Sequence, residues 1–382
     1  MKIITSMIVL LALATAQPEV EAAGAVLIEM ESGRVLLEKE SKKSLAMAST
    51  TKIMTAIMVL ENADLDDIVT VSKRAAAAPR VKMDLQAGEE IPLQGLLYAL
   101  MLQSSNDAAV AIAEHIGGTV EDFCVRMTEK AHLLGAVNTT FETASGLDTD
   151  NHYSTAHDMA IITRYALQNP DFVELINTPQ FITVSNKRTY NISNKNRLLN
   201  EYDGAMGVKT GFTNKAGHCF VGAAKRDDMQ LISVVLASGW GARGKEQKWV
   251  DTKRLLNYGF ANYEMQEIVK NGQPAGMLNV SRTRTPEVAL YYDDSITLPV
   301  HKEGENIELV AHFPNVMKAP IKANAPMGEG RVYINGEHFA SVLIKTAQSA
   351  ERHDLKTSME KVIKAFLRLG TSQELEIILP EF

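Results

Sequence analysis

The chain has 382 residues, of which 46% are hydrophobic, and it carries a formal net charge of −7 with a pI near 5.8. This length is enough for two domains and a short appendage, with a sizeable core. Because the charge balance is acidic and no basic domain stands out, the composition disfavours nucleic-acid binding. No internal apolar run of the sequence reaches the length needed to span a membrane.

The first 22 residues have the pattern of a secretory signal peptide. Met1-Lys2 is a short positive start, and Ile3 to Ala16 is an apolar run broken only by Thr and Ser. Ala14-Thr15-Ala16 has the A-x-A form of a cleavage site, and Val20-Glu21-Ala22 is a second candidate. The alternative is a buried N-terminal helix or an uncleaved anchor. We expect the mature chain to be exported.

Cysteines and histidines give no sign of a metal site. Cys124 lies in a helical pattern and Cys219 in a strand pattern, each among apolar neighbours, so we expect two buried free thiols. The nine histidines are scattered, without H-x-x-x-H spacing, and no C-x-x-C is present. The sequence therefore predicts no metal and no cofactor.

The first half of the mature chain is predicted to be mainly helical after an opening pair of strands. Residues 25–40 form two strand-like runs joined by a turn at Ser32-Gly33. Apolar spacing predicts helices at 49–60, 93–103, 107–116, 121–135 and 156–168. Asn106 is expected to cap the third of these helices. Met83, Met101 and Met127 are expected in the core.

Beyond Pro179 strands dominate. Strand-like runs at 181–185, 204–212, 218–225 and 229–238 precede a helix at about 244–263, which predicts an α+β domain: an antiparallel sheet flanked by helices. From about Glu267 the chain suggests a small β-rich domain with a hairpin at Asn335-Gly336. The predicted division is 1–22 signal peptide, 23–265 catalytic domain, 266–350 β-rich domain, and 351–382 amphipathic helix and tail.

Ser49 and Lys52 form an S-x-x-K pair at the start of a strongly apolar helix. One turn apart on one face, their Oγ and Nζ atoms can touch. A serine needs a base to become a nucleophile, and a lysine can be that base if burial or a second cation keeps it neutral. The apolar neighbours would provide the burial: Ile53, Met54, Ile57 and Met58. Taken alone the pair is weak evidence, because Ser358-Met359-Glu360-Lys361 repeats the pattern and such serines are usually caps.

Two further motifs could complete one site. Ser104-Ser105-Asn106 lies at the junction of two predicted helices, and Lys209-Thr210-Gly211, followed by Phe212, lies in a predicted strand. Glycine in a strand marks the close approach of another backbone or of a ligand. An S-x-x-K, S-x-N and K-T-G set is typical of penicillin-binding proteins and class A β-lactamases.

The segments around these motifs resemble one family. MASTTKIMTAI, QSSNDAAVAIAEHIGG, GLDTDNHYSTAHDMA and GVKTGFTNKAGHCFVGAA closely resemble the serine-type D-alanyl-D-alanine carboxypeptidases, the low-molecular-mass penicillin-binding proteins. The resemblance runs from about Ala23 to Tyr263, and more loosely through the β-rich domain. It implies a penicillin-binding/β-lactamase-like catalytic domain, peptidoglycan stem peptides as substrates, and β-lactam antibiotics as ligands. It also implies a periplasmic location, or one on the outer face of the cytoplasmic membrane.

The resemblance implies a role for each site residue. Ser49 would attack the peptide carbonyl and become acylated, Lys52 would be the base, and Ser104 would relay a proton to the leaving D-alanine. Asn106 would hold the substrate amide and Lys52. In the K-T-G strand, Lys209 would add positive potential, Thr210 would bind the terminal carboxylate, and Gly211 would allow close approach. The backbone N–H groups of Ser49 and Phe212 would form the oxyanion hole.

The sequence departs from the family at two positions. Met47 stands where a proline is usual, and Ser105 is the middle residue of S-x-N where alanine or glycine is frequent. His152, His157 and His218 lie near the predicted site, but we interpret each as structural. Lys195 matches a position that is often basic in relatives and is expected to brace a loop by the cleft.

Other activities remain open at this stage. A β-lactamase would need a base for deacylation, and no E-x-x-L-N segment lies between Asn106 and Lys209. An inactive penicillin-binding scaffold is opposed by the intact Ser49, Lys52, Ser104 and Lys209. D,D-endopeptidase activity on cross-links would use the same residues.

The segment from Leu355 to Leu369 has the pattern of a basic amphipathic helix. Its apolar residues fall on one side (Leu355, Met359, Val362, Ile363, Phe366, Leu367) and its basic residues on the other (Lys356, Lys361, Lys364, Arg368). Such a helix can lie in the interface of an anionic bilayer, as the resemblance also implies, so we expect peripheral membrane association. The alternative is a helix packed on the β-rich domain, and the acidic tail 370–382 leaves that possibility open.

Overall fold

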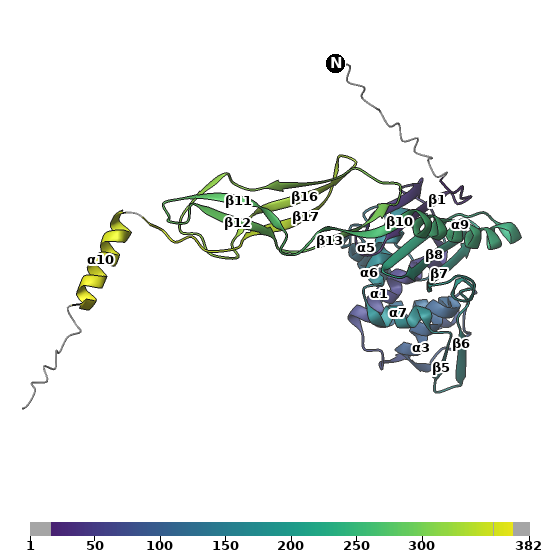
Figure 1. The fold of residues 1–382 in the computed structure, drawn as a ribbon. Coiled ribbons are helices and arrows are strands. Elements are labelled where there is room, and N and C mark those ends of the chain that lie inside the picture. The colour runs from purple at the N-terminus through teal and green to yellow at the C-terminus, as the bar shows by residue number, and fades with distance from the viewer. Residues whose placement is uncertain (1–16, 354, 370–382) are drawn as a thin grey trace, which may run out of the picture. The chain divides into compact units, whose positions relative to one another are not determined.

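The computed structural model describes residues 17–353 and 355–369 (Figure 1). The predicted signal peptide therefore lies mostly outside the described residues, and the tail 370–382 lies wholly outside them. The chain divides into two compact units, Met1–Glu264 and Met265–Phe382. Among the described helices, none is long and apolar enough to cross a membrane.

A five-stranded antiparallel sheet organises the first unit, in the order β2-β1-β9-β8-β7. Its strands are β1 (Gly24–Glu29), β2 (Val35–Lys39), β7 (Ala205–Thr213), β8 (Gly217–Arg226) and β9 (Met229–Leu236). The predicted turn at Ser32-Gly33 joins β1 and β2, and Gly33 has a φ of +72°. β7 is the last strand of the sheet, so one of its edges is not covered by another strand of that sheet.

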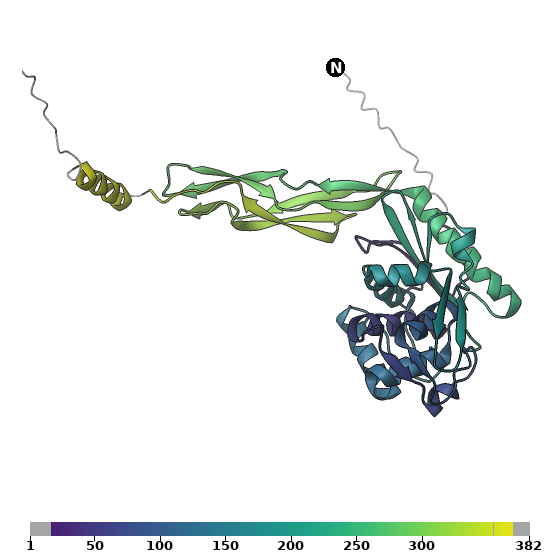
Figure 2. The ribbon, with the colours of Figure 1, turned by 90° about the horizontal axis from the view of Figure 1, so that it is seen from below.

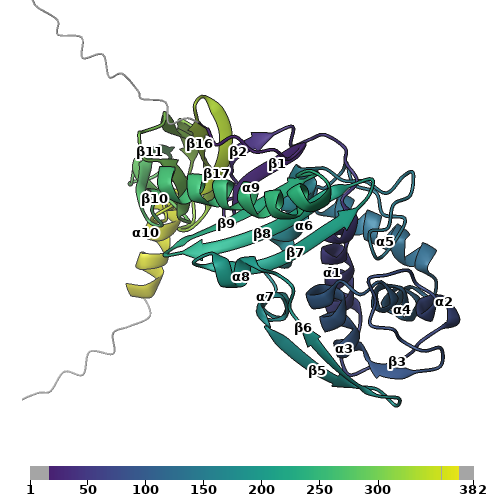
Figure 3. The ribbon, with the colours of Figure 1, turned by 90° about the vertical axis from the view of Figure 1, so that its right-hand side faces the viewer.

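Helices cover both faces of this sheet, as the alternation of its side chains requires. α9 (Gly241–Asn262) lies across one face (Figure 3) and approaches closely at Gly259, where an added Cβ would lie 2.5 Å from Leu231. On the other face, Val26 of β1 and Val234 of β9 join the helical core. α6 (Ala156–Ala166) packs against β1 and β9 there.

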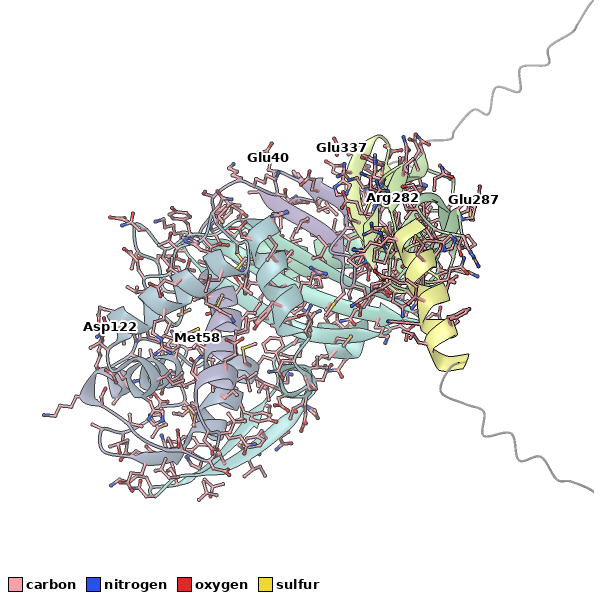
Figure 4. The ribbon with its side chains drawn as sticks, turned by 90° about the vertical axis from the view of Figure 1, so that its left-hand side faces the viewer. Glu40, Met58, Asp122, Arg282, Glu287 and Glu337 are labelled. Atoms are coloured by element: carbon pink, nitrogen blue, oxygen red, sulfur yellow. The ribbon has the colours of Figure 1, made fainter. Side chains whose placement is uncertain are left out.

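The helical part of the first unit surrounds α1 (Lys52–Asn62), whose first eight residues are all buried. Met58 of α1 lies among these helices, whereas Asp122 lies at the surface (Figure 4). The other helices are η1 (Ala48–Thr51), α2 (Lys73–Ala76), α3 (Leu93–Tyr98), η2 (Ala99–Gln103), α4 (Asn106–Gly117), α5 (Val120–Leu133), α7 (Pro170–Asn177) and α8 (Leu198–Glu201). Two small two-stranded sheets also belong to the unit: β3 (Ile68–Thr70) with β4 (Glu90–Pro92), and β5 (Gln180–Val184) with β6 (Thr189–Ser193).

The predicted α+β class is confirmed, and the three core methionines Met83, Met101 and Met127 are buried as expected. Cys124 and Cys219 are buried free thiols, also as expected. The predicted cap of α4 is wrong. Ser105 occupies the N-cap position without a side-chain hydrogen bond, and Asn106 is the first helical residue, with its side chain directed into the site described below.

The second unit is built on a six-stranded sheet in the order β14-β16-β17-β12-β11-β15 (Figure 2). These strands are β11 (Pro274–Ser281), β12 (Glu287–Tyr292), β14 (Ile307–His312), β15 (Val316–Lys318), β16 (Pro326–Ile334) and β17 (Glu337–Thr346). β10 (Tyr263–Val269) pairs with β13 (Ile296–His301). The predicted hairpin at Asn335-Gly336 joins β16 and β17. Both residues have positive φ, as a two-residue turn of this kind requires.

The helix α10 (Leu355–Leu369) ends the described chain. Five of its apolar residues are between 53% and 77% exposed: Met359, Val362, Ile363, Phe366 and Leu367. These five side chains are therefore not buried against the β-rich sheet.

Candidate active site

Ser49 and Lys52 meet where η1 passes into α1. Ser49 lies in the 3-10 turn and Lys52 is the first residue of the α-helix, so they are one turn apart as predicted. Their Oγ and Nζ atoms are 3.0 Å apart. Lys52 is completely buried, and the apolar neighbours Ile53, Met54, Ile57 and Met58 are buried around it. The nucleophile candidate thus contacts an amine that water does not reach.

Two further oxygens hold the Lys52 amine. Nζ donates to Oδ1 of Asn106 at 2.9 Å and to the carbonyl oxygen of Ser145 at 2.5 Å. A neutral amine has two N–H groups and one lone pair. If Asn106 and Ser145 accept the two N–H groups, the lone pair faces the hydroxyl of Ser49. An ammonium would donate to all three oxygens, and a neutral Lys52 that keeps its bonds to Asn106 and Ser145 can accept the proton of Ser49.

Burial holds the pKa of Lys52 well below its ordinary value of 10.5, because desolvation disfavours the ammonium form. The positive charge of Lys209 lowers this pKa further, while the carboxylate of Asp107 acts in the opposite direction. Asp107 is fully engaged elsewhere, because its carboxylate accepts the backbone N–H groups of Met83 and Leu85 at 3.1 Å each. Desolvation is the largest cause of the lowered pKa of Lys52.

The backbone around Ser49 is unusually crowded. Ala48 has a φ of +50°, a left-handed conformation that is rare for a residue with a side chain. A Cβ on Gly146 would lie 1.9 Å from the carbonyl oxygen of Ala48, and a Cβ on Gly211 would lie 3.1 Å from the backbone nitrogen of Ser49. Only glycine lets residue 146 approach Ala48 this closely, and a side chain at residue 211 would require β7 or its neighbours to shift by a few tenths of an ångström. The predicted use of Gly211 as a point of close approach fits this packing.

Ser104 and Asn106 come from the junction between η2 and α4. η2 is a π-helical turn, and Ser104 ends it with a φ of +68°. This conformation turns the chain so that Asn106 opens α4 and places its amide between Lys52 and the carbonyl oxygen of Pro79, to which Nδ2 donates at 3.1 Å. Ser104 is half-buried beside this amide in the chain. Ser105 is completely buried, and its hydroxyl has no hydrogen-bond partner among the described residues.

The K-T-G residues line the edge strand β7. Lys209 is 2% exposed and its Nζ donates to the carbonyl oxygen of Thr210 at 3.1 Å, so it contacts its own strand. Its influence on Lys52 is electrostatic. Burial lowers the pKa of Lys209 to about 7, and the charges of Lys195 and Lys248 lower it further. A carboxylate arriving here would restore the protonated form, because it supplies the missing opposite charge.

Lys248 was not anticipated from the sequence. It lies on α9, is 7% exposed, and its ammonium stands 5.0 Å from the ring of Trp249. Burial lowers the pKa of Lys248 to about 8. The only sequence signal was a lysine on the apolar side of a helix, which ordinarily means a side chain reaching outward. Lys195, in contrast, is exposed, and its backbone N–H donates to the carbonyl oxygen of Leu102, which joins its loop to η2.

The three nearby histidines have structural partners, in line with their predicted roles. His152 is 3% exposed and contacts the hydroxyl of Thr51 at 2.8 Å. His218 stacks under the half-exposed ring of Phe212, with 4.3 Å between ring centroids. His157 lies 3.7 Å from the carboxylate of Asp158. Stacking on His218 therefore fixes the position of the Phe212 ring.

The second S-x-x-K pair differs in its surroundings. It lies on α10, where Lys361 is exposed and forms an ion pair with Glu351 at 3.2 Å. An exposed, paired ammonium is not desolvated in the way that would make it a base. The structure therefore separates Ser49 from Ser358, which the sequence pattern alone could not do.

Comparisons with known proteins agree with this geometry. A family model described as D-alanyl-D-alanine carboxypeptidase matches residues 2–239, and a model of the C-terminal domain of penicillin-binding protein 5 matches residues 263–352. The chain is 31% identical over 352 residues to D-alanyl-D-alanine carboxypeptidase DacF of Bacillus subtilis, covering 90% of this chain and 89% of that protein. It is 35% identical over 337 residues to DacC of Escherichia coli, covering 84% and 82%.

A solved structure leads to the same family. The structure of penicillin-binding protein 5 from Haemophilus influenzae has a TM-score of 0.75 and 28% sequence identity, covering 88% of this chain and 99% of that one. The resemblance inferred from the motifs is confirmed over both units. This chain belongs to the family of serine-type D-alanyl-D-alanine carboxypeptidases, the low-molecular-mass penicillin-binding proteins.

Proposed function

We propose that this chain removes the terminal D-alanine from peptidoglycan stem pentapeptides through an acyl-enzyme at Ser49. The observation that carries the proposal is the 3.0 Å contact between Ser49 Oγ and the Nζ atom of the fully buried Lys52. Neutral Lys52 takes the hydroxyl proton as Oγ attacks the carbonyl carbon of the fourth residue. The carbonyl oxygen becomes an oxyanion, which the backbone N–H groups of Ser49 and Phe212 stabilise.

The leaving group departs when the peptide C–N bond breaks and its nitrogen accepts a proton. We assign to Ser104, two residues before the Lys52 partner Asn106, the relay of this proton from protonated Lys52 to the nitrogen, which returns Lys52 to its neutral form. Water then attacks the ester carbonyl and Lys52 removes the water proton. Lys52 passes this proton to Ser49 Oγ as the ester C–O bond breaks, which releases the tetrapeptide. Asn106 holds Lys52 throughout and offers its amide to the substrate backbone.

The terminal carboxylate is the feature that distinguishes this substrate from an internal peptide. We assign it to Thr210 and to the positive potential of Lys209, with Lys248 and Lys195 adding to that potential. Burial lowers the pKa values of Lys209 and Lys248, so an anionic group that pairs with their charge is favoured here. β-Lactam antibiotics also carry a carboxylate, and we propose that they acylate Ser49 in the same way.

The test compares Ser49→Ala with a matched control, Ser358→Ala. We expect Ser49→Ala to abolish both covalent labelling by fluorescent penicillin and release of D-alanine from a pentapeptide ending in D-Ala-D-Ala, with the melting temperature preserved. Ser358→Ala removes the serine of the second S-x-x-K pair and should leave both activities at the wild-type level. Covalent labelling of the Ser49→Ala protein would refute the assignment.

We also propose where the protein acts and which residues form each of its domains. The mature protein acts outside the cytoplasm, residues 23–265 form the catalytic domain, and 266–350 form a separate β-rich domain. The helix α10, whose apolar side is exposed and whose polar side carries Lys356, Lys361 and Lys364, attaches the protein to the surface of an anionic membrane.

A further inference from the structure

Trp240 is a large aromatic residue that the reaction described above does not use. It lies between β9 and α9 and is 54% exposed. Its indole Nε1 donates to the carbonyl oxygen of Asn214 at 2.9 Å. A Cβ on Gly217 would lie 3.0 and 3.2 Å from Cε2 and Cζ2 of the indole, so the ring rests on this glycine. The ring is therefore fixed by its edge and by close packing, while more than half of the residue remains open to solvent.

The position of Trp240 relative to Ser49 follows from β7 and β8. Asn214 directly follows β7, and Gly217 begins β8. Lys209 and Thr210, to which we assign the terminal carboxylate, come before Phe212 on β7. The substrate residues before the cleaved bond would therefore extend the other way, toward Asn214. Because β7 is an edge strand, an extended peptide can lie along it. The path of the stem peptide thus leads from Ser49 toward Trp240.

The length of the stem peptide matches this path. Four residues remain between the cleaved bond and the glycan strand, and fully extended they span at most about 14 Å. Asn214 lies two residues beyond Phe212, which is about 7 Å along a strand. The stem therefore has enough length to carry its sugar to the end of the β7–β8 hairpin, where the indole is held.

We propose that Trp240 binds a pyranose ring of the glycan strand that bears the stem peptide. A pyranose presents a flat face of C–H groups, which can stack on a fixed indole, while its hydroxyl groups remain in water. Because the indole is already held by Asn214 and Gly217, stacking costs little ordering of the protein. The proposal rests on the proposed carboxypeptidase function and extends the substrate from the peptide alone to the peptide with its sugar.

The kinetic test compares two substrates with the same peptide, a free pentapeptide and a disaccharide pentapeptide. We expect Trp240→Ala to lower kcat/KM for the disaccharide substrate by about threefold to tenfold, the range for one aromatic contact, and to leave the free pentapeptide unchanged. Trp240→Phe should keep most of the preference for the disaccharide pentapeptide over the free pentapeptide. Leu133→Ala removes an exposed apolar side chain from the end of α5, 85% exposed, and should leave both rates unchanged. An equal loss on both substrates would show that Trp240 only supports the hairpin, and the proposal would fail.

A binding measurement separates this proposal from the catalytic one. The chain has two tryptophans, and the other, Trp249, is 5% exposed, so sugar binding at Trp240 should change the fluorescence of the exposed residue. Titrating Ser49→Ala protein with the disaccharide pentapeptide needs no turnover. We expect a fluorescence change that the free pentapeptide does not produce and that disappears in the Ser49→Ala, Trp240→Phe double variant. The same change with both ligands, or no change with either, would overturn the proposal even if the wild-type enzyme releases D-alanine.

Discussion

The hydroxyl of Thr51 lies 2.8 Å from Nε2 of His152 and donates to the carbonyl oxygen of Ala48 at 2.8 Å, so a buried imidazole supports the residue that precedes the nucleophile. Nδ1 of His152 accepts the backbone N–H of Glu142 at 3.0 Å, which leaves the proton on Nε2 to be donated to Thr51. Burial lowers the pKa of His152 to about 4, so this tautomer is kept at neutral pH. His152 thus joins the 142–152 loop to the strained turn at Ser49.

His152→Phe should weaken both the fold and the site. The substitution leaves the hydroxyl of Thr51 and the N–H of Glu142 without their partner, a loss of about 1–3 kcal/mol in the free energy of unfolding. We also expect slower acylation by penicillin, because Ala48 is held less firmly. Urea unfolding and stopped-flow labelling measure the two effects. His338→Ala, which removes an exposed imidazole from the other unit, should change neither. If His152→Phe acylates at the wild-type rate, His152 does not position the nucleophile.

Gly211→Ala should slow acylation more than it lowers stability. The added methyl would lie 3.1 Å from the backbone nitrogen of Ser49, the carbonyl oxygen of Met47 and the Cβ of Ala48. β7 must then move outward by a few tenths of an ångström, which displaces the N–H of Phe212 from the oxyanion. Displacements near 1 Å cost about a hundredfold in rate, so we expect a loss of about tenfold in the acylation rate. Wild-type acylation by this variant would show that the two backbones need not approach so closely.

The pH dependence of hydrolysis should reflect two lysines with opposite requirements. Lys52 must be neutral, so kcat/KM falls on the acid side as Lys52 becomes protonated. Lys209 must be charged to attract the carboxylate, so kcat/KM also falls above about pH 7, where the free enzyme loses this charge. Bound carboxylate raises the pKa of Lys209, so kcat should persist to higher pH than kcat/KM. Lys209→Arg should move the alkaline decline of kcat/KM upward, because a guanidinium stays protonated. A flat profile between pH 5 and 9 would exclude a lysine base.

Lys209→Met should raise the free energy of unfolding of the protein while lowering its hydrolytic activity. Between about pH 7 and 10.5 the unfolded chain holds a proton on Lys209 that the folded chain has released, so wild-type stability rises with pH across this window. Replacing a buried ionisable group with an apolar one of similar size can add about 1–4 kcal/mol. We expect this gain at pH 7 and a smaller gain at pH 10, measured by urea unfolding. Lower stability of Lys209→Met at pH 7 would mean that the ammonium has a stabilising partner.

Short-range patterns in the sequence were sufficient to predict much of the fold and of the site. The alternation of apolar residues predicted the strands on either side of Ser32-Gly33, and the spacing of Ser49 and Lys52 predicted their contact. The cap of α4 was predicted wrongly, because Asn106 is an ordinary capping residue in isolation. Its side chain bonds instead to Lys52, 54 positions earlier in the chain, and no local pattern contains that contact.

Backbone groups account for most of what the sequence could not predict. Ser145 holds Lys52 through its carbonyl oxygen, which every residue possesses, so its side chain gave no signal. The left-handed conformation of Ala48 likewise depends on the packing of Gly146 and Gly211, which come from distant segments. Lys248 was missed because its burial follows from how α9 lies on the sheet. Each omission is a tertiary contact made by residues that look ordinary in sequence.

Membrane binding by α10 is the remaining prediction. Phe366 and its apolar neighbours are exposed on one side of the helix, and Lys356, Lys361 and Lys364 are exposed as well, so the helix offers both an inserting face and an electrostatic one. We expect the mature chain to sediment with liposomes containing anionic lipid, and a chain truncated after Ala350 to remain in solution.

Each lysine near the surface contributes about 1 kcal/mol, so the Lys356→Gln, Lys361→Gln, Lys364→Gln variant should bind more weakly and with less dependence on salt. Phe366→Ser should weaken binding without changing its salt dependence, because it removes apolar area and no charge. Equal sedimentation of the full and truncated chains would remove α10 as the attachment.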